Sequence, residues 1–225
     1  MNLLIVADEE SPALWDYYTP GKLAGYDLIL SCGDLKARYL EFLVTMARCP
    51  LLYVHGNHDG SYDRQPPEGC DCMDDRLVIY KGLRILGLGG SRKYSGGSYQ
   101  YSEWQMERRI RKLRTAIRLA GGVDIVLAHG APRGVGDAED RTHQGFEAFL
   151  RLIDTYHPAW FLHGHVHLNY GIHIPRVSSY STTQVINCCG KYALENVTVE
   201  DRKPIGRLKK MLCKLIAKNL LILDC

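Results

Sequence analysis

The sequence has no apolar stretch long enough to cross a membrane. Its opening apolar run, Leu3–Ala7, is shorter than the apolar region of a signal peptide and is followed directly by Asp8, Glu9 and Glu10. Elsewhere no run approaches the roughly 18 apolar residues that a spanning helix requires. We therefore expect a cytoplasmic protein without a transmembrane span.

Cysteine pairs with the spacing of a zinc knuckle or a redox motif are also missing. Cys70 and Cys72 are separated by one residue and Cys188 and Cys189 are adjacent, whereas those motifs place two residues between the pair. In a chain without an export signal, scattered cysteines are expected to be reduced thiols. Repeats and low-complexity segments are absent too, so the 225 residues, 46% of them hydrophobic, are expected to fold as one globular domain.

Positive charge is concentrated at the end of the chain. The net charge is +3, but residues 202–225 carry more positive charge than that, so residues 1–201 are net negative. Residues 201–225 are predicted to form a basic amphipathic helix that is not a separate domain. Packing on its own domain or against a second copy is favoured for this helix, and contact with an anionic membrane surface is the alternative. Its predicted apolar face contains Leu208, Met211, Leu212, Leu215, Ile216 and Leu223.

Short runs rich in Val, Ile and Leu alternate with amphipathic segments, a pattern typical of an α/β fold. A strand, a helix and a strand follow one another near the start, and the last three strands are predicted to form a β-meander. Residues 60–75 and 87–97 are predicted to be loops. The predicted helices are 37–47, 103–120 and a segment near 143–156. The predicted strands are 3–8, 28–34, 51–57, 77–80, 83–88, 125–129, 160–165, 171–174, 184–189 and 192–199.

Polar side chains lie at the ends of five of these predicted strands. All offer nitrogen or oxygen donors and none offers a thiolate, a set that suits first-row ions such as Mn²⁺, Fe and Zn²⁺. The set is too large for one ion, and the carboxyl ends of strands are where α/β sheets place their ligands. Taken singly, Asp34 is also compatible with a turn residue, and each histidine with a structural hydrogen bond. The candidate ligands are Asp8, Glu10, Asp34, Asn57, His129, His163 and His165.

The order of these residues resembles the calcineurin-like metallophosphoesterase family across nearly all of residues 1–200. The resemblance implies a metallophosphoesterase domain over that range. Its fold would be a βαββαβ-type sandwich of two mixed sheets flanked by helices, with a two-metal centre at the carboxyl ends of the strands. The motifs that carry the resemblance are Asp8-x-Glu10, Gly33-Asp34, Gly56-Asn57-His58-Asp59, His129 and His163-Gly164-His165.

The resemblance also implies roles for individual residues. Asp34 would bridge two divalent ions, and His58 would be the general acid rather than a ligand. Paired ions can hold a phosphoryl group and generate a hydroxide nucleophile near neutral pH, and a nearby imidazole can protonate the leaving oxygen. Asp59 would either orient His58 or act as a turn residue. One ion would be held by Asp8, Glu10 and His165, and the other by Asn57, His129 and His163.

Glu10 departs from the pattern, because most family members have His at this position. Glu can still ligate through oxygen, but a third carboxylate makes the centre less positive. We therefore expect a preference for Mn²⁺, with Fe and Zn²⁺ as alternatives, and for singly charged diesters over doubly charged monoesters. Glu9 in a shifted register, or His167, are alternative donors if Glu10 does not ligate.

Contacts to substrate are expected from the loop around Arg92, Lys93 and Tyr94. Arg92 is the candidate for binding phosphate oxygens, because its guanidinium can form a bidentate pair, and loop solubility is the alternative. The aromatic residues that follow are expected to anchor the next helix rather than to stack on bases. The arginine-rich side of that helix is expected to be a solvated charged face.

Three functions follow from these observations. The favoured one is a dinuclear metal-dependent phosphoester hydrolase, a phosphodiesterase or phosphatase acting on a small or nucleotide-like phosphoester. A nuclease of the same chemistry is the second, and the net negative charge of residues 1–201 disfavours nucleic acid as a partner. The third is a non-catalytic, metal-binding scaffold for protein interactions, which the retained His58 and Asn57 argue against.

Overall fold

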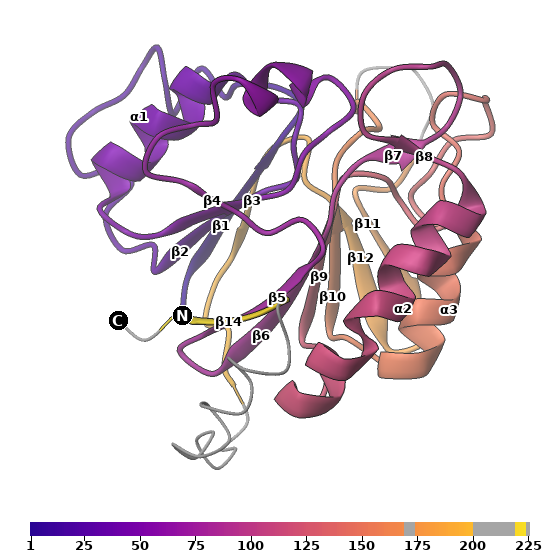
Figure 1. Ribbon diagram of the computed structural model, residues 1–225. Coiled ribbons are helices and arrows are strands. Elements are labelled where there is room, and N and C mark those ends of the chain that lie inside the picture. Colours follow the sequence, from indigo (N-terminus) through magenta and orange to yellow (C-terminus); the bar gives the residue numbers. More distant parts are fainter. Residues whose placement is uncertain (169–173, 200–218, 224–225) are drawn as a thin grey trace.

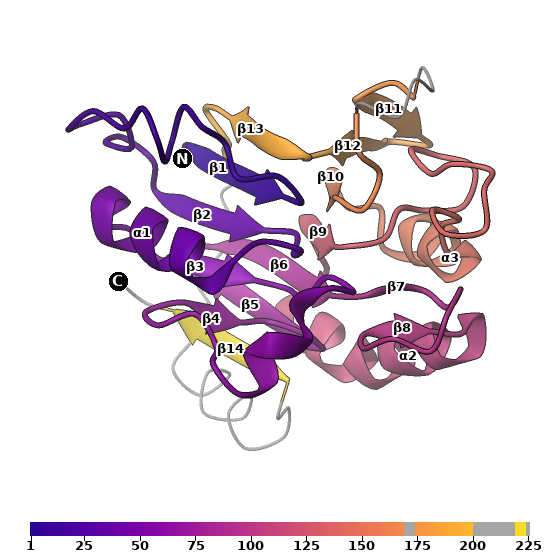
Figure 2. The same ribbon diagram turned by 90° about the horizontal axis from the view of Figure 1, so that it is seen from above.

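The computed structural model describes residues 1–168, 174–199 and 219–223. Two β-sheets lie face to face, with one helix outside the first sheet and two helices outside the second (Figures 1 and 2). This arrangement confirms the predicted α/β class with two mixed sheets flanked by helices. Among the helices of these ranges, none combines the length and the apolar character needed to cross a membrane.

The first sheet contains the strands β1 (Leu3–Ala7), β2 (Leu28–Ser31), β3 (Leu51–Tyr53), β4 (Asp71–Cys72) and β13 (Gly190–Leu194). Their order is β13-β1-β2-β3-β4. The first four strands run parallel, and β13 pairs with β1 in the antiparallel direction. Helix α1 (Ala37–Ala47) covers the outer face of this sheet.

The second sheet contains the strands β5 (Arg76–Tyr80), β6 (Leu83–Leu88), β9 (Ile125–Ala128), β10 (Trp160–His163), β11 (Val177–Tyr180), β12 (Thr183–Asn187) and β14 (Leu220–Leu223). Their order is β11-β12-β10-β9-β6-β5-β14. Helices α2 (Glu103–Ala120) and α3 (Glu147–Tyr156) cover its outer face. A short ribbon, β7 (Ser91–Arg92) with β8 (Gln100–Tyr101), and a 3₁₀ helix, η1 (Asp59–Asp63), lie outside both sheets.

Both faces of the central strands β1, β2, β3 and β9 are buried, which explains why their sequences are almost entirely apolar. In β1, Leu3, Ile5 and Ala7 belong to the core between the two sheets, whereas Leu4 and Val6 belong to the core beneath α1. Successive side chains of a strand point to opposite faces, so a strand covered on both sides reads as a continuous apolar run. The carboxyl ends of the parallel strands therefore provide the first positions at which polar side chains are tolerated.

The predicted helices 37–47 and 103–120 are confirmed with the same bounds, and α3 begins four residues later than its predicted segment. Helix α2 begins with a capping box in which Ser102 and Gln105 satisfy each other's backbone N–H groups. It ends at Gly121, which has a φ of 81°. The bounds were predicted from the apolar period of both segments, and in α2 these caps agree with them.

Several strands end earlier than predicted. Strands β1 and β2 stop before Asp8 and Asp34, whose φ values of 59° and 57° are left-handed and cannot continue a strand. The side chains of both residues accept backbone hydrogen bonds from other loops. Tertiary contacts that sequence periodicity does not detect therefore set these strand ends.

The predicted closing β-meander is wrong. Strands β11 and β12 form an antiparallel hairpin in the second sheet, but β13 crosses to the first sheet and pairs with β1, with Ala7 bridged to Cys189 at the crossing. The unpaired edge of β1 accounts for this route, because β13 gives its backbone groups partners. Most of the predicted strand 171–174 lies outside the described residues.

The predicted helix 201–225 lies largely outside the described residues, and where its end is described it is wrong. Leu220–Leu223 form strand β14, which pairs in parallel with β5 at the edge of the second sheet. These four consecutive aliphatic residues pair with a strand edge. Leu220 packs in the core beneath α2 and α3, and Leu223 packs against the core between the two sheets. A continuous apolar run fits such a strand as well as it fits a helix.

The prediction of a solvated basic face on α2 is wrong for Arg109. Its side chain is only 8% exposed, and its Nε donates to Asp75 at 2.7 Å while Nη1 donates to the carbonyl oxygen of Gly89 at 2.6 Å. Its guanidinium also lies 4.1 Å from the centre of the Tyr101 ring. Arg109 thus ties α2 to the segment that leads into β7 and the loop of Arg92.

We predict that Arg109→Ala lowers the free energy of unfolding by about 2–3 kcal/mol. The substitution leaves the Gly89 carbonyl and Asp75 without their charged partner, and the cost is at the lower end for a broken pair because Asp75 is partly exposed. The matched control is Lys112→Ala on the exposed side of α2, which should change stability by less than about 0.5 kcal/mol. Urea unfolding of both variants measures the difference. Equal effects would mean that Arg109 adds nothing beyond surface charge.

Candidate metal centre

The predicted ligands come together where the carboxyl ends of strands from both sheets meet. Asp8 follows β1, Asp34 lies beyond β2, and Asn57 follows β3 in the first sheet. His129 follows β9, and His163 is the last residue of β10 in the second sheet. Two packed layers thus contribute donors to one place, which is why residues so distant in sequence can share a site.

Asp34, Asn57 and His129 form the centre of the cluster. His129 Nε2 lies 3.2 Å from an oxygen of Asp34 and 3.0 Å from Oδ1 of Asn57. On its other side, His129 Nδ1 donates to the carbonyl oxygen of Cys32 at 2.8 Å, which fixes the ring orientation. The ligand atoms of Asp34, His129 and His165 all lie within 4.8 Å of one another. Such a spacing is short enough for metal binding.

Asp8 and His165 connect the two sheets on the other side of the cluster. Both carboxylate oxygens of Asp8 accept from the backbone N–H of His165, at 2.9 and 3.0 Å. A Cβ on Gly164 would lie only 2.6 Å from an oxygen of Asp8, so glycine is required there. His165 itself has a φ of 67°, and left-handed backbone at non-glycine residues such as Asp8, Asp34 and His165 is concentrated at functional sites.

His163 provides the clearest indication that an ion belongs here. Its Nδ1 donates to the carbonyl oxygen of Gly164 at 2.9 Å, but its Nε2 has no hydrogen-bond partner although the residue is fully buried. It is the one such side-chain atom among the described residues. A buried nitrogen without a partner costs about 1–3 kcal/mol, and a metal ion would satisfy it. The residues present therefore fit a cation.

The charges of the cluster agree with this fit. Burial raises the pKa of Asp8 to about 6, because a carboxylate in this position has too little compensating charge. Burial also opposes the charge on Asp34, but the neighbouring His129 more than offsets it and lowers the pKa of Asp34 to about 2. Burial lowers the pKa of His163 to about 4 and that of His165 to about 3, so both rings are neutral and available as ligands.

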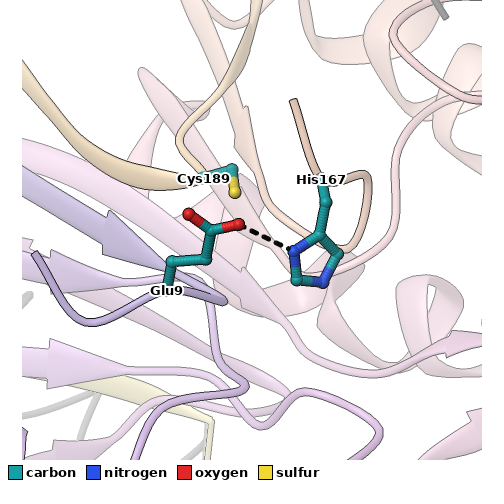
Figure 3. Close-up of side chains that lie close together, drawn as sticks. All are labelled: Glu9, His167 and Cys189. Atoms are coloured by element: carbon teal, nitrogen blue, oxygen red, sulfur yellow. Dashed lines mark hydrogen bonds and ion pairs between the residues drawn. The ribbon is translucent and has the colours of Figure 1, made fainter. Parts of the chain in front are cut away.

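Glu10 lies at the same cleft but not inside the cluster. Its carboxylate is 3.4 Å from Nζ of Lys36, and it is not among the groups of described residues whose ligand atoms lie within 4.8 Å of one another. The alternative donors Glu9 and His167 pair with each other, at 3.1 Å between Oε1 and Nδ1 (Figure 3). The three consecutive acids thus have three different neighbours.

His58 and Asp59 have separate surroundings. The side chain of His58 is exposed at the cleft, and its backbone N–H donates to Asp34 Oδ1 at 2.7 Å. Asp59 is buried, and its Oδ2 accepts from the backbone N–H groups of Asp34 and Gly56 at 2.8 and 2.7 Å. These bonds favour the turn role for Asp59, which holds two strand ends together.

The loop of Arg92 approaches the cluster through Tyr94, which was expected in this loop but was given no role of its own. Nδ2 of Asn57 donates to the hydroxyl oxygen of Tyr94 at 3.2 Å, and the Tyr94 ring centre is 6.5 Å from that of His165. Arg92 instead donates from Nη1 to Oε1 of Gln144 at 2.7 Å. The contact between Tyr94 and Asn57 exists only in the folded loop, so no spacing in the sequence indicates it.

An open cleft of about 480 Å³ lies beside the cluster. It combines predicted ligands, the exposed His58 and the Lys36–Glu10 pair, so a ligand in it would meet all three. Its lining residues are Asp8, Glu9, Glu10, Asp34, Leu35, Lys36, His58, Asp59 and Ser61.

Comparison with known proteins gives a family match and a fold match. A sequence model of the calcineurin-like phosphoesterases matches residues 8–169. Lariat debranching enzymes of Caenorhabditis briggsae and Caenorhabditis elegans are each 23% identical over 69% of this chain, which corresponds to 43% and 44% of their own lengths. The chain therefore spans less than half the length of these relatives.

Two solved crystal structures share the fold. One has a TM-score of 0.59 at 12% identity and covers 86% of this chain and 94% of its own. The other, the protein TT1561 of Thermus thermophilus, has a TM-score of 0.54 at 17% identity and covers 84% of this chain and 88% of its own.

We predict opposite effects for two buried histidines when the metal-free protein is unfolded by urea in EDTA. His163→Leu should leave the free energy of unfolding unchanged or raise it, because it removes the unpaired Nε2. His129→Leu should lower it by about 2–3 kcal/mol, because it leaves Asp34 without its charged partner.

The same unfolding experiment with Mn²⁺ completes the test. Saturating Mn²⁺, at about 100 times its dissociation constant, should stabilise the wild type by about 2.7 kcal/mol for each bound ion and His163→Leu by less. A His163→Leu variant that is destabilised in EDTA and keeps the full gain from Mn²⁺ would contradict the assignment of His163 as a ligand.

Proposed function

The chain belongs to the calcineurin-like phosphoesterase family, a family of metal-dependent phosphoester hydrolases, and we propose that it cleaves phosphodiesters in the cleft beside Asp34 and His58. The observation that carries this proposal is the cluster of Asp34, His129 and His165, whose ligand atoms lie within 4.8 Å of one another beside an exposed imidazole. A non-catalytic, metal-binding scaffold would not need the exposed imidazole.

Two divalent ions would be held by the residues that the sequence singled out. The ligand atoms of Asp34, His129 and His165 lie within 4.8 Å of one another, which suits a carboxylate that bridges the ion of His165 and the ion of His129. We assign Asp8, Glu10 and His165 to one ion, and Asn57, His129 and His163 to the other. When bound, the two ions would supply positive charge for the phosphoryl oxygens and lower the pKa of a coordinated water. Mn²⁺ is our choice on the donor set, with Fe and Zn²⁺ as alternatives.

His58 is the group that we propose to protonate the leaving oxygen. Its side chain is exposed at the cleft, while its own backbone is anchored to Asp34. An imidazole positioned in this way can transfer a proton without competing for the metal ions. Tyr94, which is bonded to Asn57, would border the substrate on the other side. Arg92 remains a proposed phosphate contact that requires release from Gln144.

Glu10 supports a diester over a monoester. With three carboxylates near two divalent ions, the centre carries less positive charge than one with His at position 10, and a doubly charged monoester is attracted less. The Glu10 carboxylate lies at the cleft, 3.4 Å from Nζ of Lys36. The substrate class that we propose is therefore a small or nucleotide-like phosphodiester.

A nucleic-acid phosphodiester is the second candidate, and it is favoured by the name of the relatives, which are lariat debranching enzymes. Two observations argue against it. The exposed arginines of α2 do not line the cleft. Arg151 of α3 is paired with three carboxylates, those of Glu103, Glu107 and Glu147. The free thiols of the described cysteines are compatible with a cytoplasmic location. That location, oligomerisation and membrane contact stay predictions.

We predict Mn²⁺-dependent hydrolysis of bis-p-nitrophenyl phosphate that exceeds hydrolysis of p-nitrophenyl phosphate. Asp34→Asn should abolish both. Glu10→His should shift the ratio of kcat/KM values toward the monoester by roughly tenfold, because one unit of charge at a few ångströms is worth more than about 1.4 kcal/mol at an effective dielectric constant of about 20. Steady-state kinetics on both esters measures the ratio. A wild type that prefers the monoester would overturn the argument from Glu10 and leave the hydrolase intact.

We predict that His58→Ala lowers kcat for the diester by about 10²–10⁴-fold, the usual contribution of a positioned general acid. The bound Mn²⁺, counted by elemental analysis, should stay at the wild-type value because His58 is not a ligand. A diester with a more acidic leaving group should recover part of the lost rate. Loss of metal together with activity would instead place His58 among the ligands.

A further inference from the structure

A second group of ligand atoms lies beside the proposed dinuclear centre and is not used by it. It consists of Glu9, His167 and Cys189, whose donor atoms all lie within 4.8 Å of one another. Figure 3 shows the carboxylate, the imidazole and the sulfur approaching one another from three chain segments. Glu9 follows β1, His167 lies beyond β10, and Cys189 lies where the chain crosses from β12 to β13.

We propose that Glu9, His167 and Cys189 bind one further divalent ion of the Zn²⁺ type. Carboxylate, imidazole and thiolate are the three kinds of side chain that bind zinc in proteins, and three protein ligands leave a fourth position open. A thiolate favours Zn²⁺ over the harder Mn²⁺ proposed for the neighbouring centre. On binding, Cys189 would release its thiol proton to solvent and the sulfur would bond to the ion.

The fold already positions the cysteine for this role. Cys189 is only 3% exposed, its backbone N–H donates to Oδ1 of Asn187 at 3.0 Å, and its carbonyl oxygen accepts from Arg176 at 3.1 Å. Its backbone is therefore held on both sides. The Glu9 and His167 side chains are 44% and 33% exposed, so an ion can enter from solvent.

A comparable group elsewhere in the protein lacks this openness. The ligand atoms of His55, Cys72 and Asp74 also lie within 4.8 Å of one another. There, however, the two oxygens of Asp74 accept from His55 at 2.7 Å and from the backbone of Gly89 at 2.9 Å. The His55 ring is also stacked on Tyr99 at 4.2 Å between centres. That group is an internal ion pair, and Cys72 provides a matched control cysteine.

The position of the proposed ion gives it a consequence for the fold. It would join the end of β1 in the first sheet to the end of β10 in the second, at the crossing where Cys189 bridges Ala7. Glu9 is adjacent to Asp8, and His167 is two residues from His165. An ion on Glu9 and His167 would therefore restrain the backbone that carries two of the proposed catalytic-centre ligands.

Titration of the metal-free protein with Co²⁺ tests the proposal without reference to activity. Thiolate ligation gives Co²⁺ a charge-transfer band in the near ultraviolet, and none of the ligands proposed for the dinuclear centre is a thiolate. We expect the band to appear in the wild type and to be displaced by Zn²⁺. It should be lost in Cys189→Ser and kept in Cys72→Ser.

Two more variants keep the outcome decisive. Asp34→Asn should abolish hydrolysis but keep the band, so failure of the proposed function and failure of this site are distinguishable. Glu9→Gln, a change at a half-exposed side chain, should weaken the Co²⁺ affinity measured from the band about tenfold or more. This variant replaces Cys189→Ser as the test if Cys189→Ser does not fold. Absence of the band from the wild type, its persistence in Cys189→Ser, or an unchanged affinity in Glu9→Gln would each overturn the proposal.

Discussion

The contact between Asp34 and His129 is the interaction on which the site depends, because it joins the two sheets at the end where polar side chains of both meet. Each partner sits at the tip of a strand whose body is buried on both faces. The ion pair is buried, with His129 fully enclosed and Asp34 11% exposed. A buried pair contributes little to stability but is costly to break. It therefore fixes where the two layers meet more than it strengthens the fold.

Two glycines of the sequence motifs are required because the carboxylates of Asp34 and Asp8 pack closely against them. A Cβ on Gly56 would lie 2.0 Å from Oδ1 of Asp34, so any side chain there would displace the carboxylate. The same argument applies to Gly164 beside Asp8. Asp59 completes the arrangement because its carboxylate binds the backbone of Asp34 and of Gly56. The Gly-Asn-His-Asp motif thus combines a donor, an exposed imidazole and the residue that keeps its own turn closed.

The sequence predicted what is encoded locally and missed what depends on other segments. Helices 37–47 and 103–120 have periodic apolar faces, and α2 has its own caps, so their bounds were found. The candidate ligand residues were singled out because each follows an apolar run, and their role as ligands stays a prediction. The route of β13, the strand at Leu220–Leu223 and the burial of Arg109 all depend on partners elsewhere in the chain: the edge of β1, the edge of β5, and Asp75 with Gly89. Periodicity within a segment does not contain that information.

The three consecutive acids after β1 illustrate how much one short segment determines. Asp8 turns into the cluster and accepts the backbone of His165, Glu9 pairs with His167, and Glu10 faces Lys36. The left-handed backbone at Asp8 breaks the strand, so the alternation that would place Glu9 opposite its two neighbours no longer applies. Each acid instead meets a different positive or hydrogen-bonding partner. Glu10, at the position where the family pattern has His, therefore belongs to a segment that places negative charge at three sites. These are the metal centre, the group of Glu9, His167 and Cys189, and the cleft. A change at any one of these residues alters the field at the other two, because they lie within a few residues of one another and inside the Debye length of about 8 Å at physiological salt.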